Sequence, residues 1–352
     1  MMSPQELGLL QTLMSQRAAS LPPGLPPPTG AAAPDRTTPD ARASASETPA
    51  SPKETGPIRS TDPLQRLTEG TVIETVLINR LAGSTLPKDI PEFLRSYGGV
   101  QALEYYGPEP DRWRSPAEPE LNAAQAPEHF IDLEWADLAG PLPRRRYDYV
   151  RALAAAQVKH PDMDLKPEKV GLQPYETTEV YERLQSAFRD YRAELAAGKD
   201  TRPSEGEITF LAGWLGHYVG DGSMPLHTSI NYNGWVMPNP NGYTTEHHIH
   251  SLFESEFVHA NVKLQDVAPL IPAEPVALGD VFNDYMAYLR HSNTLVEQTY
   301  QLEKAGGFAG AGTPEGKAFV DQQLAAGATE LRNMIYTAWV KSAEPVPQYQ
   351  GN

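Results

Sequence analysis

Six stretches of the sequence repeat apolar residues at spacings of three and four, and this periodicity constrains the fold more than any other feature. Such spacing lines apolar side chains along one face of an α-helix, whereas a half-buried strand alternates apolar and polar residues. Strand-like alternation is almost absent after residue 85. We therefore predict an all-α domain built as a multi-helix bundle. The predicted helices are 144–159, 176–197, 204–221, 246–262, 276–304 and 314–341.

The first quarter of the chain differs in composition from the rest. Eleven of the 34 prolines lie between Pro22 and Pro63, among Ala, Ser, Thr and Gly. Such a segment buries too little apolar surface to offset the entropy of ordering it, so we predict a disordered linker. Residues 70–80 (GTVIETVLINR) are rich in β-branched side chains, which predicts one strand without a hairpin partner. The predicted divisions are a largely disordered segment 1–83, a helical domain 84–345 and a tail 346–352.

Charge and cysteine content exclude several classes of protein. The chain has 29 basic and 45 acidic residues, a net charge of −16, which disfavours a general DNA-coating protein. Bound divalent cations can reverse the local field, so an enzyme that acts on a polyanion stays possible. Cysteine is absent, which excludes disulfides, thiol catalysis and Cys-based zinc sites. No apolar run approaches the roughly 18 residues of a membrane span, and no secretion signal is recognisable. For the chain as written we expect a cytoplasmic location and no stable membrane span.

Histidines and acids recur four positions apart in the second half of the chain. His217 and Asp221 have this spacing in LGHYVGD, and His250 and Glu254 repeat it in HIHSLFES. Residues four apart share one face of a helix. His227 follows the first pair, as the last residue of MPLH. Imidazole and carboxylate are the usual non-sulfur ligands of zinc, and helix bundles gather metals with such pairs. The spacing alone leaves a metal site open beside its alternatives, which are surface ion pairs or a buried histidine with satisfied hydrogen bonds.

Two further groups of side chains have both a functional and a structural interpretation. His160 and Asp164 form a third pair at the same spacing, but Pro161 follows the histidine and we interpret the pair as fortuitous. Tyr232, Trp235 and Tyr243 lie in the loop between His227 and His250. These aromatic rings could stack a nucleobase, line an acyl or headgroup pocket, or cover the core.

The runs HYVGDGSMPLHTS and HSLFESEF resemble the zinc-dependent phospholipase C and S1/P1 nuclease superfamily. That superfamily has the pattern His-x3-Asp-x5-His, a variable loop, and then His-x3-Asp or His-x3-Glu. Upstream, GPEPDRW offers Asp111 and PEHFID offers His129 for an earlier Asp and His of the same pattern. The resemblance covers roughly residues 84–345. It implies an all-α bundle with its metals at the bottom of a cleft.

The resemblance implies seven zinc ligands in two sites. The first ion would be held by Asp111, His129, His217 and Asp221, and the second by His227, His250 and Glu254. In the superfamily the counterpart of Asp221 also bridges toward a third zinc, whose other ligands are an N-terminal Trp and a nearby His. No Trp precedes Trp113 and no His precedes His129. We therefore expect about two zinc ions and an incomplete third site.

The activity implied is zinc-dependent hydrolysis of a phosphodiester. Zinc ions would bind phosphate oxygens, lower the pKa of a bound water to about neutral and stabilise the leaving group. Asp111 would orient or deprotonate that water. The substrate, single-stranded nucleic acid or a phospholipid headgroup, stays open, because Glu254 in His-x3-Glu favours the phospholipase branch while the long His227–His250 loop favours the nuclease branch. Members of the superfamily are usually periplasmic or secreted.

The N-terminal segment resembles a different family. Residues 1–83, above all RLTEGTVIETVLINRLAGS, are similar to the proline-rich stretch and first barrel strand of TrbI/VirB10-type conjugal transfer proteins. This implies a fusion, or a sequence-assembly error, that replaced the leader and first helix of the hydrolase. The alternative is a genuine N-terminal extension that matches that family by chance. Two alternatives follow: a catalytically impaired product that retains structural zinc, or a scaffold fragment of a conjugation apparatus whose strand pairs with another chain. The sequence leaves the oligomeric state open.

Overall fold

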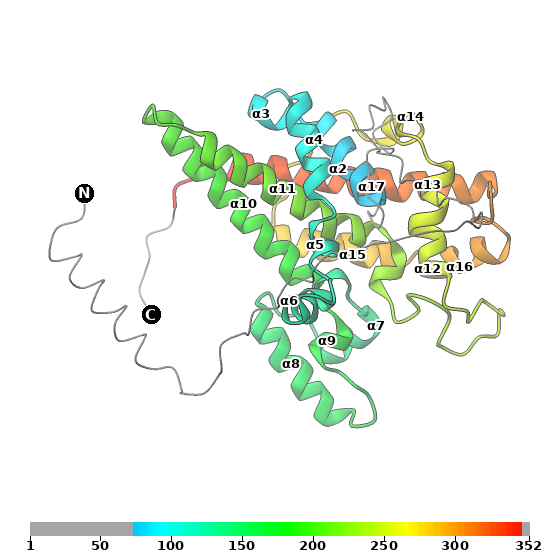
Figure 1. Ribbon diagram of the computed structural model, residues 1–352. Helices are drawn as coiled ribbons and strands as arrows, with labels where there is room; N and C mark the ends of the chain where they lie inside the picture. Colours follow the sequence, from blue (N-terminus) through cyan, green and yellow to red (C-terminus); the bar gives the residue numbers. More distant parts are fainter. Residues whose placement is uncertain (1–72, 347–352) are drawn as a thin grey trace, which may run out of the picture. The chain divides into compact units, whose positions relative to one another are not determined.

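Residues 73–346 are described by a computed structural model, and within this range the chain is helical (Figure 1). The predicted all-α class is confirmed. Among these residues no β-strand forms, and only two isolated bridges occur, Ile131 with Gly171 and Tyr232 with Gly234. The predicted disordered linker and nearly all of the predicted tail lie outside the described residues. None of the described helices is both long and apolar enough to cross a membrane.

Three long helices pack against one another at the centre of the bundle. They are α10 (Gln173–Ala196), α11 (Arg202–Ser223) and α17 (Pro314–Lys341). From Leu211 to Ser223, every residue of α11 except Trp214 is buried. A helix buried around its whole circumference lies inside its domain, so neighbouring helices must cover α11 on all sides. Those neighbours include α2 (Ile73–Ser84), α4 (Tyr97–Tyr106) and α15 (Val281–Asn293).

Most predicted helices agree with the structure to within a few residues. The prediction 314–341 matches α17, whose start is fixed by Thr313, since its side chain accepts a hydrogen bond from the Gly316 amide (3.1 Å). The predictions 144–159, 176–197 and 204–221 correspond to α8 (Arg146–Lys159), α10 and α11. The prediction 276–304 becomes two helices, α15 and α16 (Val296–Lys304).

The segment predicted as a helix over 246–262 is less regular. It consists of α12 (Ile249–Ser251), the π-helical turn η5 (Leu252–Phe257) and α13 (Val258–Asn261). A π-turn closes its hydrogen bonds over five residues instead of four and is frequent at functional sites. The remaining short helices are α3 (Glu92–Arg95), α5 (Glu109–Arg112), α6 (Pro119–Gln125), η2 (Ala126–His129), α7 (Leu133–Ala136), η3 (Asp137–Ala139), α9 (Pro167–Val170), η4 (Pro225–Thr228), α14 (Leu264–Val267) and η6 (Ala268–Leu270).

The predicted strand over residues 70–80 is wrong, because Ile73–Ser84 forms helix α2. Preference for strands among β-branched residues is weak and yields to packing. Leu77, Ile78 and Leu81 also fit helical spacing, and all three are buried in the core shared with α4, α11 and α17. The helical bundle therefore includes residues on the N-terminal side of the predicted boundary at 83/84. The scaffold alternative called for a strand at this position, and the structure has a helix there.

Glycines on α11 allow α2 to lie directly against it. A Cβ atom at Gly216 would stand 1.8 Å from Oδ1 of Asn79, and one at Gly220 would stand 3.3 Å from Cδ1 of Ile78. The buried Asn79 amide donates hydrogen bonds to the carbonyl oxygens of Leu103 (2.8 Å) and Gly213 (2.9 Å). These bonds join α2 to both α4 and α11.

Candidate metal centre

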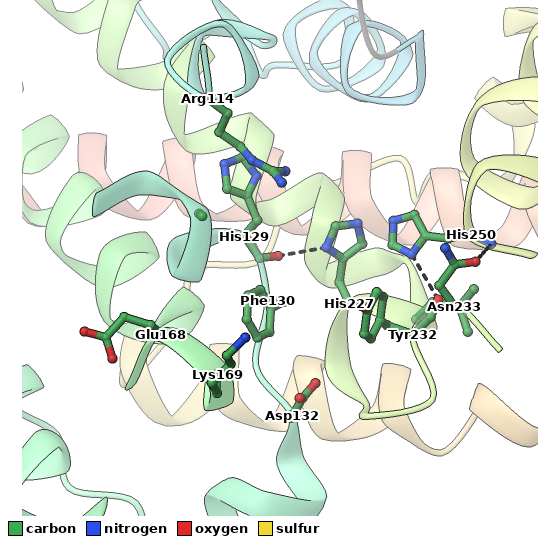
Figure 2. A pocket seen from close by; sticks show the side chains of 12 residues that line it. Arg114, His129, Phe130, Asp132, Glu168, Lys169, His227, Tyr232, Asn233 and His250 are labelled. Carbon is green, nitrogen blue, oxygen red and sulfur yellow. Dashed lines mark hydrogen bonds between the residues drawn. The ribbon is translucent and has the colours of Figure 1, made fainter. Parts of the chain in front are cut away.

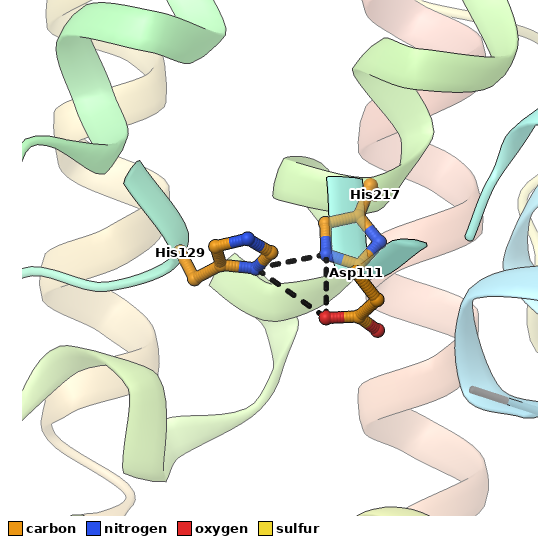
Figure 3. Close-up of side chains that lie close together, drawn as sticks. All are labelled: Asp111, His129 and His217. Atoms are coloured by element: carbon orange, nitrogen blue, oxygen red, sulfur yellow. Dashed lines mark hydrogen bonds and ion pairs between the residues drawn. The ribbon is translucent and has the colours of Figure 1, made fainter. Parts of the chain in front are cut away.

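The first group of predicted ligands converges on the C-terminal half of α11 (Figure 3). Nδ1 of His129 and Nε2 of His217 lie 2.9 Å apart, and Oδ1 of Asp111 lies 3.9 Å and 3.8 Å from these two nitrogens. Oδ2 of Asp221 lies 3.2 Å from the first and 3.5 Å from the second. The structure thus brings together all four residues predicted for the first ion.

Three elements distant in sequence supply this cluster. Asp111 lies on α5, His129 ends the 3-10 helix η2, and His217 and Asp221 lie one turn apart on α11. Only Asp111 has an appreciably accessible side chain, 23% exposed against 3% or less for the others. Solvent therefore reaches the cluster on the Asp111 side.

The second group of predicted ligands forms a separate cluster. Nε2 of His250 lies 2.9 Å from Oε2 of Glu254, and Nε2 of His227 lies 3.8 Å from the same oxygen. His227 belongs to η4, His250 to α12, and Glu254 to the π-turn η5. All seven predicted ligands therefore lie in one of two compact clusters.

Backbone carbonyl groups orient three of the four imidazoles. Each of these rings directs Nδ1 toward a carbonyl oxygen, which only accepts, so Nδ1 carries a hydrogen, and in the neutral ring Nε2 keeps its lone pair for a metal. The acceptors are Gly107 for His217 (3.1 Å), His129 for His227 (2.8 Å) and Tyr232 for His250 (3.1 Å). Histidines that bind metals are usually held in this way through the second ring nitrogen.

The chemistry of both clusters fits a divalent metal. Nε2 of His227 is buried and has no hydrogen-bond partner among residues 73–346, although it is directed at Glu254. Imidazole nitrogens combined with one or two carboxylates are a donor set that zinc accepts. A bound ion would give Nε2 of His227 the partner that no hydrogen bond within residues 73–346 supplies.

Burial and charge shift the pKa values of the ligands in opposite directions. Burial lowers the pKa of His129. Burial also disfavours the charged form of His227, but the carboxylates of Asp221 and Glu254 outweigh it and raise the pKa of His227 to about 10. Burial opposes ionisation of Glu254, yet His227 and His250 hold its pKa well below the usual range. Without a cation, a proton on His227 balances these carboxylates, and metal binding would displace it.

A pocket of about 360 Å³ opens onto both clusters (Figure 2). His129 contributes to its wall from the first cluster, and His227 and His250 contribute from the second. Phe130 and Tyr232 add aromatic surface. A ligand in this pocket could touch both clusters at once.

The three loop aromatics differ in position, since one lines the pocket and two pack on the core. Tyr232 lines the pocket and is 54% exposed. Trp235 and Tyr243 instead pack on the buried ring of Tyr300, with ring centroids 5.1 Å and 5.8 Å from it. The Tyr243 hydroxyl donates to Glu297 (2.8 Å). These two rings cover the core.

The third histidine–acid pair takes no part in either cluster. His160 follows the last residue of α8. Asp164 forms an ion pair with Lys166 (3.2 Å). The interpretation of this pair as fortuitous agrees with its position.

Glu74 is a buried acid, influenced by the charges of both clusters, that the sequence motifs did not indicate. It lies in the first turn of α2 and is only 3% exposed. Burial, reinforced by the charges of Glu254 and Asp221, raises its pKa well above the usual range. Assigning residues 70–80 to a strand concealed it. A helical reading places Glu74 one turn before the apolar pair Leu77 and Ile78, and an acid on an apolar face is the signal that could have found it.

Comparison with known proteins adds no relative. No protein-family model matches the sequence, and neither a curated protein nor a solved structure matches it. The chemical interpretation of the two clusters therefore depends on their geometry and on the resemblance of their motifs.

Proposed function

We propose that the chain is a metal-dependent phosphodiester hydrolase, with zinc as its metal. The observation that carries this proposal is the meeting of two histidine–carboxylate clusters on one pocket. When bound, zinc ions supply Lewis-acid stabilisation of the phosphate and an activated water. The clusters are the parts of the described chain whose donor sets suit that metal.

Asp111 is the candidate for positioning the attacking water and receiving its proton. It is the most accessible member of the first cluster. A guanidinium nitrogen of Arg114 lies 3.8 Å from Oδ1 of Asp111, and Arg114 also lines the pocket. Arg114 can therefore donate hydrogen bonds to a phosphate oxygen beside Asp111.

The charges of the pocket favour nucleic acid over a zwitterionic phospholipid headgroup as substrate. Arg114 and Lys169 contribute two cations to the wall, against the carboxylates of Glu168 and Asp132. Burial raises the pKa of Asp132 to about 8, so this acid is mostly neutral at pH 7. The net charge of these wall residues is therefore positive, although the whole chain is acidic. A positive wall attracts a nucleic-acid strand, which carries several phosphates.

Turnover of bis(p-nitrophenyl) phosphate by the full chain tests the proposed chemistry. We expect hydrolysis that a chelator abolishes and added zinc restores. His217→Ala should abolish it, and His160→Ala, the matched control outside the clusters, should leave it unchanged. Hydrolysis that is indifferent to chelation, or an inactive zinc-loaded protein, would refute the proposal. Parallel assays on single-stranded DNA and on phosphatidylcholine micelles then decide the substrate.

A further inference from the structure

One buried hydroxyl group closes a turn in the loop that leads to the second cluster. Tyr300, on helix α16, is fully buried, and its hydroxyl donates a hydrogen bond to the carbonyl oxygen of Asn231 (2.6 Å). The same hydroxyl oxygen accepts a hydrogen bond from the Gly234 amide (2.9 Å). The tyrosine therefore joins the two ends of a turn whose middle residues are Tyr232 and Asn233.

Both middle residues of this turn form hydrogen bonds with His250 (Figure 2). The carbonyl oxygen of Tyr232 accepts from Nδ1 of the imidazole (3.1 Å), and Oδ1 of Asn233 accepts from the backbone amide of His250 (3.4 Å). The ring contact sets the direction of Nε2, which lies 2.9 Å from Oε2 of Glu254. The turn thus holds both the backbone of His250 and the orientation of its metal-binding nitrogen.

The conformation of the turn depends on the Tyr300 hydroxyl. Gly234 has a φ of +105°, and a Cβ atom there would stand 2.8 Å from the carbonyl oxygen of Thr245. Asn231 is 2% exposed, so its carbonyl group has almost no access to water. Removal of the hydroxyl would take a donor from this carbonyl and an acceptor from the Gly234 amide, and buried backbone groups without partners are costly. We therefore expect the turn to move when the hydroxyl is lost.

Other contacts attach the loop to α16 without this hydroxyl. Trp235 and Tyr243 pack on the ring of Tyr300, which a phenylalanine would retain. Oε1 of Glu297 accepts hydrogen bonds from the Tyr243 hydroxyl (2.8 Å) and from Nδ2 of Asn241 (3.0 Å). Loss of the Tyr300 oxygen alone should therefore leave the loop in place and change the turn.

We propose that Tyr300 is a positioning residue for the second metal ion, because its hydroxyl fixes the turn that orients His250. This inference rests on the metal centre of the proposed function. The hydroxyl acts through the turn, since its hydrogen bonds go to Asn231 and Gly234 and to neither histidine cluster. A ligand that is already oriented binds its metal without the cost of being ordered, and groups that support a ligand in this way affect metal affinity strongly.

Zinc binding by the full chain tests this role, with Tyr300→Phe as the variant. Zinc is titrated into metal-free wild type and variant in competition with a chromophoric chelator, which resolves the affinities of the two ions. Tyr300→Phe should weaken one ion by about 10–100-fold, the range typical of residues that support a ligand, and leave the other unchanged. Glu254→Gln, which lacks a ligand of the second ion, identifies the affected ion. With Co²⁺ in place of zinc, the visible absorption of that ion should change as well, because it depends on ligand geometry.

Tyr175→Phe is the matched control. Tyr175 is 2% exposed, and its hydroxyl also donates to a backbone carbonyl oxygen, that of Pro143 (2.9 Å), which belongs to neither cluster. This variant loses the same kind of bond and should bind both zinc ions as the wild type does. A loss in Tyr175→Phe equal to that in Tyr300→Phe would attribute the effect to general destabilisation and overturn the proposal.

Equal zinc affinities in the wild type and Tyr300→Phe, or equal weakening of both ions, also overturns the role of Tyr300. If the zinc-loaded wild type hydrolyses bis(p-nitrophenyl) phosphate in those cases, the proposed function stands and the positioning role alone fails. A wild type that binds two zinc ions without hydrolysis refutes the proposed function, and the comparison of affinities still decides the role of Tyr300. A wild type that binds no zinc overturns both.

Discussion

The close contact between α2 and α11 predicts that Gly216→Ala destabilises the protein. The new methyl group would stand 1.8 Å from Oδ1 of Asn79, 2.6 Å from its Cγ and 2.8 Å from Cδ2 of Leu331. Asn79 cannot rotate away without losing its bonds to the carbonyl oxygens of Leu103 and Gly213. The substitution therefore forces α2 away from α11 or breaks both hydrogen bonds.

The magnitude follows from three contributions. The two hydrogen bonds are worth about 1 kcal/mol each. Overpacking a filled core costs about 1–3 kcal/mol. Replacing glycine by alanine inside a helix returns about 1 kcal/mol. The net loss is about 2–4 kcal/mol, or roughly 4–10 °C in Tm for a domain of this size.

Thermal unfolding followed by circular dichroism measures this loss, with Gly206→Ala as the control. Gly206 lies on the same helix, and a Cβ there meets no atom within 4 Å. The control should be stabilised by about 0.4–1 kcal/mol. A Gly216→Ala protein as stable as the wild type would refute the argued contact, and equal effects at both positions would attribute the change to helix propensity alone.

Three further outcomes are expected. Asp221→Asn should reduce phosphodiester turnover by more than about 100-fold, which is the upper range for a residue that only supports a ligand. The loss should also exceed that of Glu254→Gln. If His160→Ala damages turnover as much as Asp221→Asn does, the ligands are misassigned. Chelation should lower Tm in calorimetry, because zinc at 100 times its Kd stabilises the folded state by about 2.7 kcal/mol per site; a Tm unaffected by chelation would argue against both clusters as metal sites. In protein freed of metal by a chelator, the pKa of His227 is raised to about 10, above the value of about 6.5 in the unfolded chain. The stabilisation of the fold by protonated His227 is therefore complete below pH 6.5 and is lost as the pH rises toward 10. The difference in Tm between wild type and His227→Gln should accordingly shrink over that range, and a difference that grows with pH would contradict the assignment.

The long helices could be predicted because the local sequence determines both their apolar spacing and the residues at which they end. Helix α17 begins where Thr313 caps it, and its predicted limits are those observed. The region around Glu254 was harder, since apolar spacing does not reveal where the hydrogen-bond pattern changes from that of an α-helix to that of a π-turn. Strand propensity misled the interpretation of Ile73–Ser84, because burial against three other helices outweighs the preference of a few β-branched residues.

The candidate site, like the fold, could be predicted from the sequence only in part. Spacing alone indicated the pairs on α11 and around η5, and the motif resemblance added Asp111 and His129. The carbonyl groups that orient the imidazoles could not be foreseen, because Gly107 and Tyr232 meet their histidines only through tertiary packing. Nor does local sequence reveal the pocket, whose walls come from segments more than 100 residues apart.

Glu74 connects the packing of the fold with the candidate site. The glycines that let α2 approach α11 also bury its carboxylate beside Asp221 and Glu254. Burial of a charge there opposes docking of the helix. Burial and the neighbouring carboxylates raise the pKa of the Glu74 carboxyl well above its usual range, and protonation lowers the cost of docking. The packing of the first helix therefore affects the charge of the region around Asp221 and Glu254.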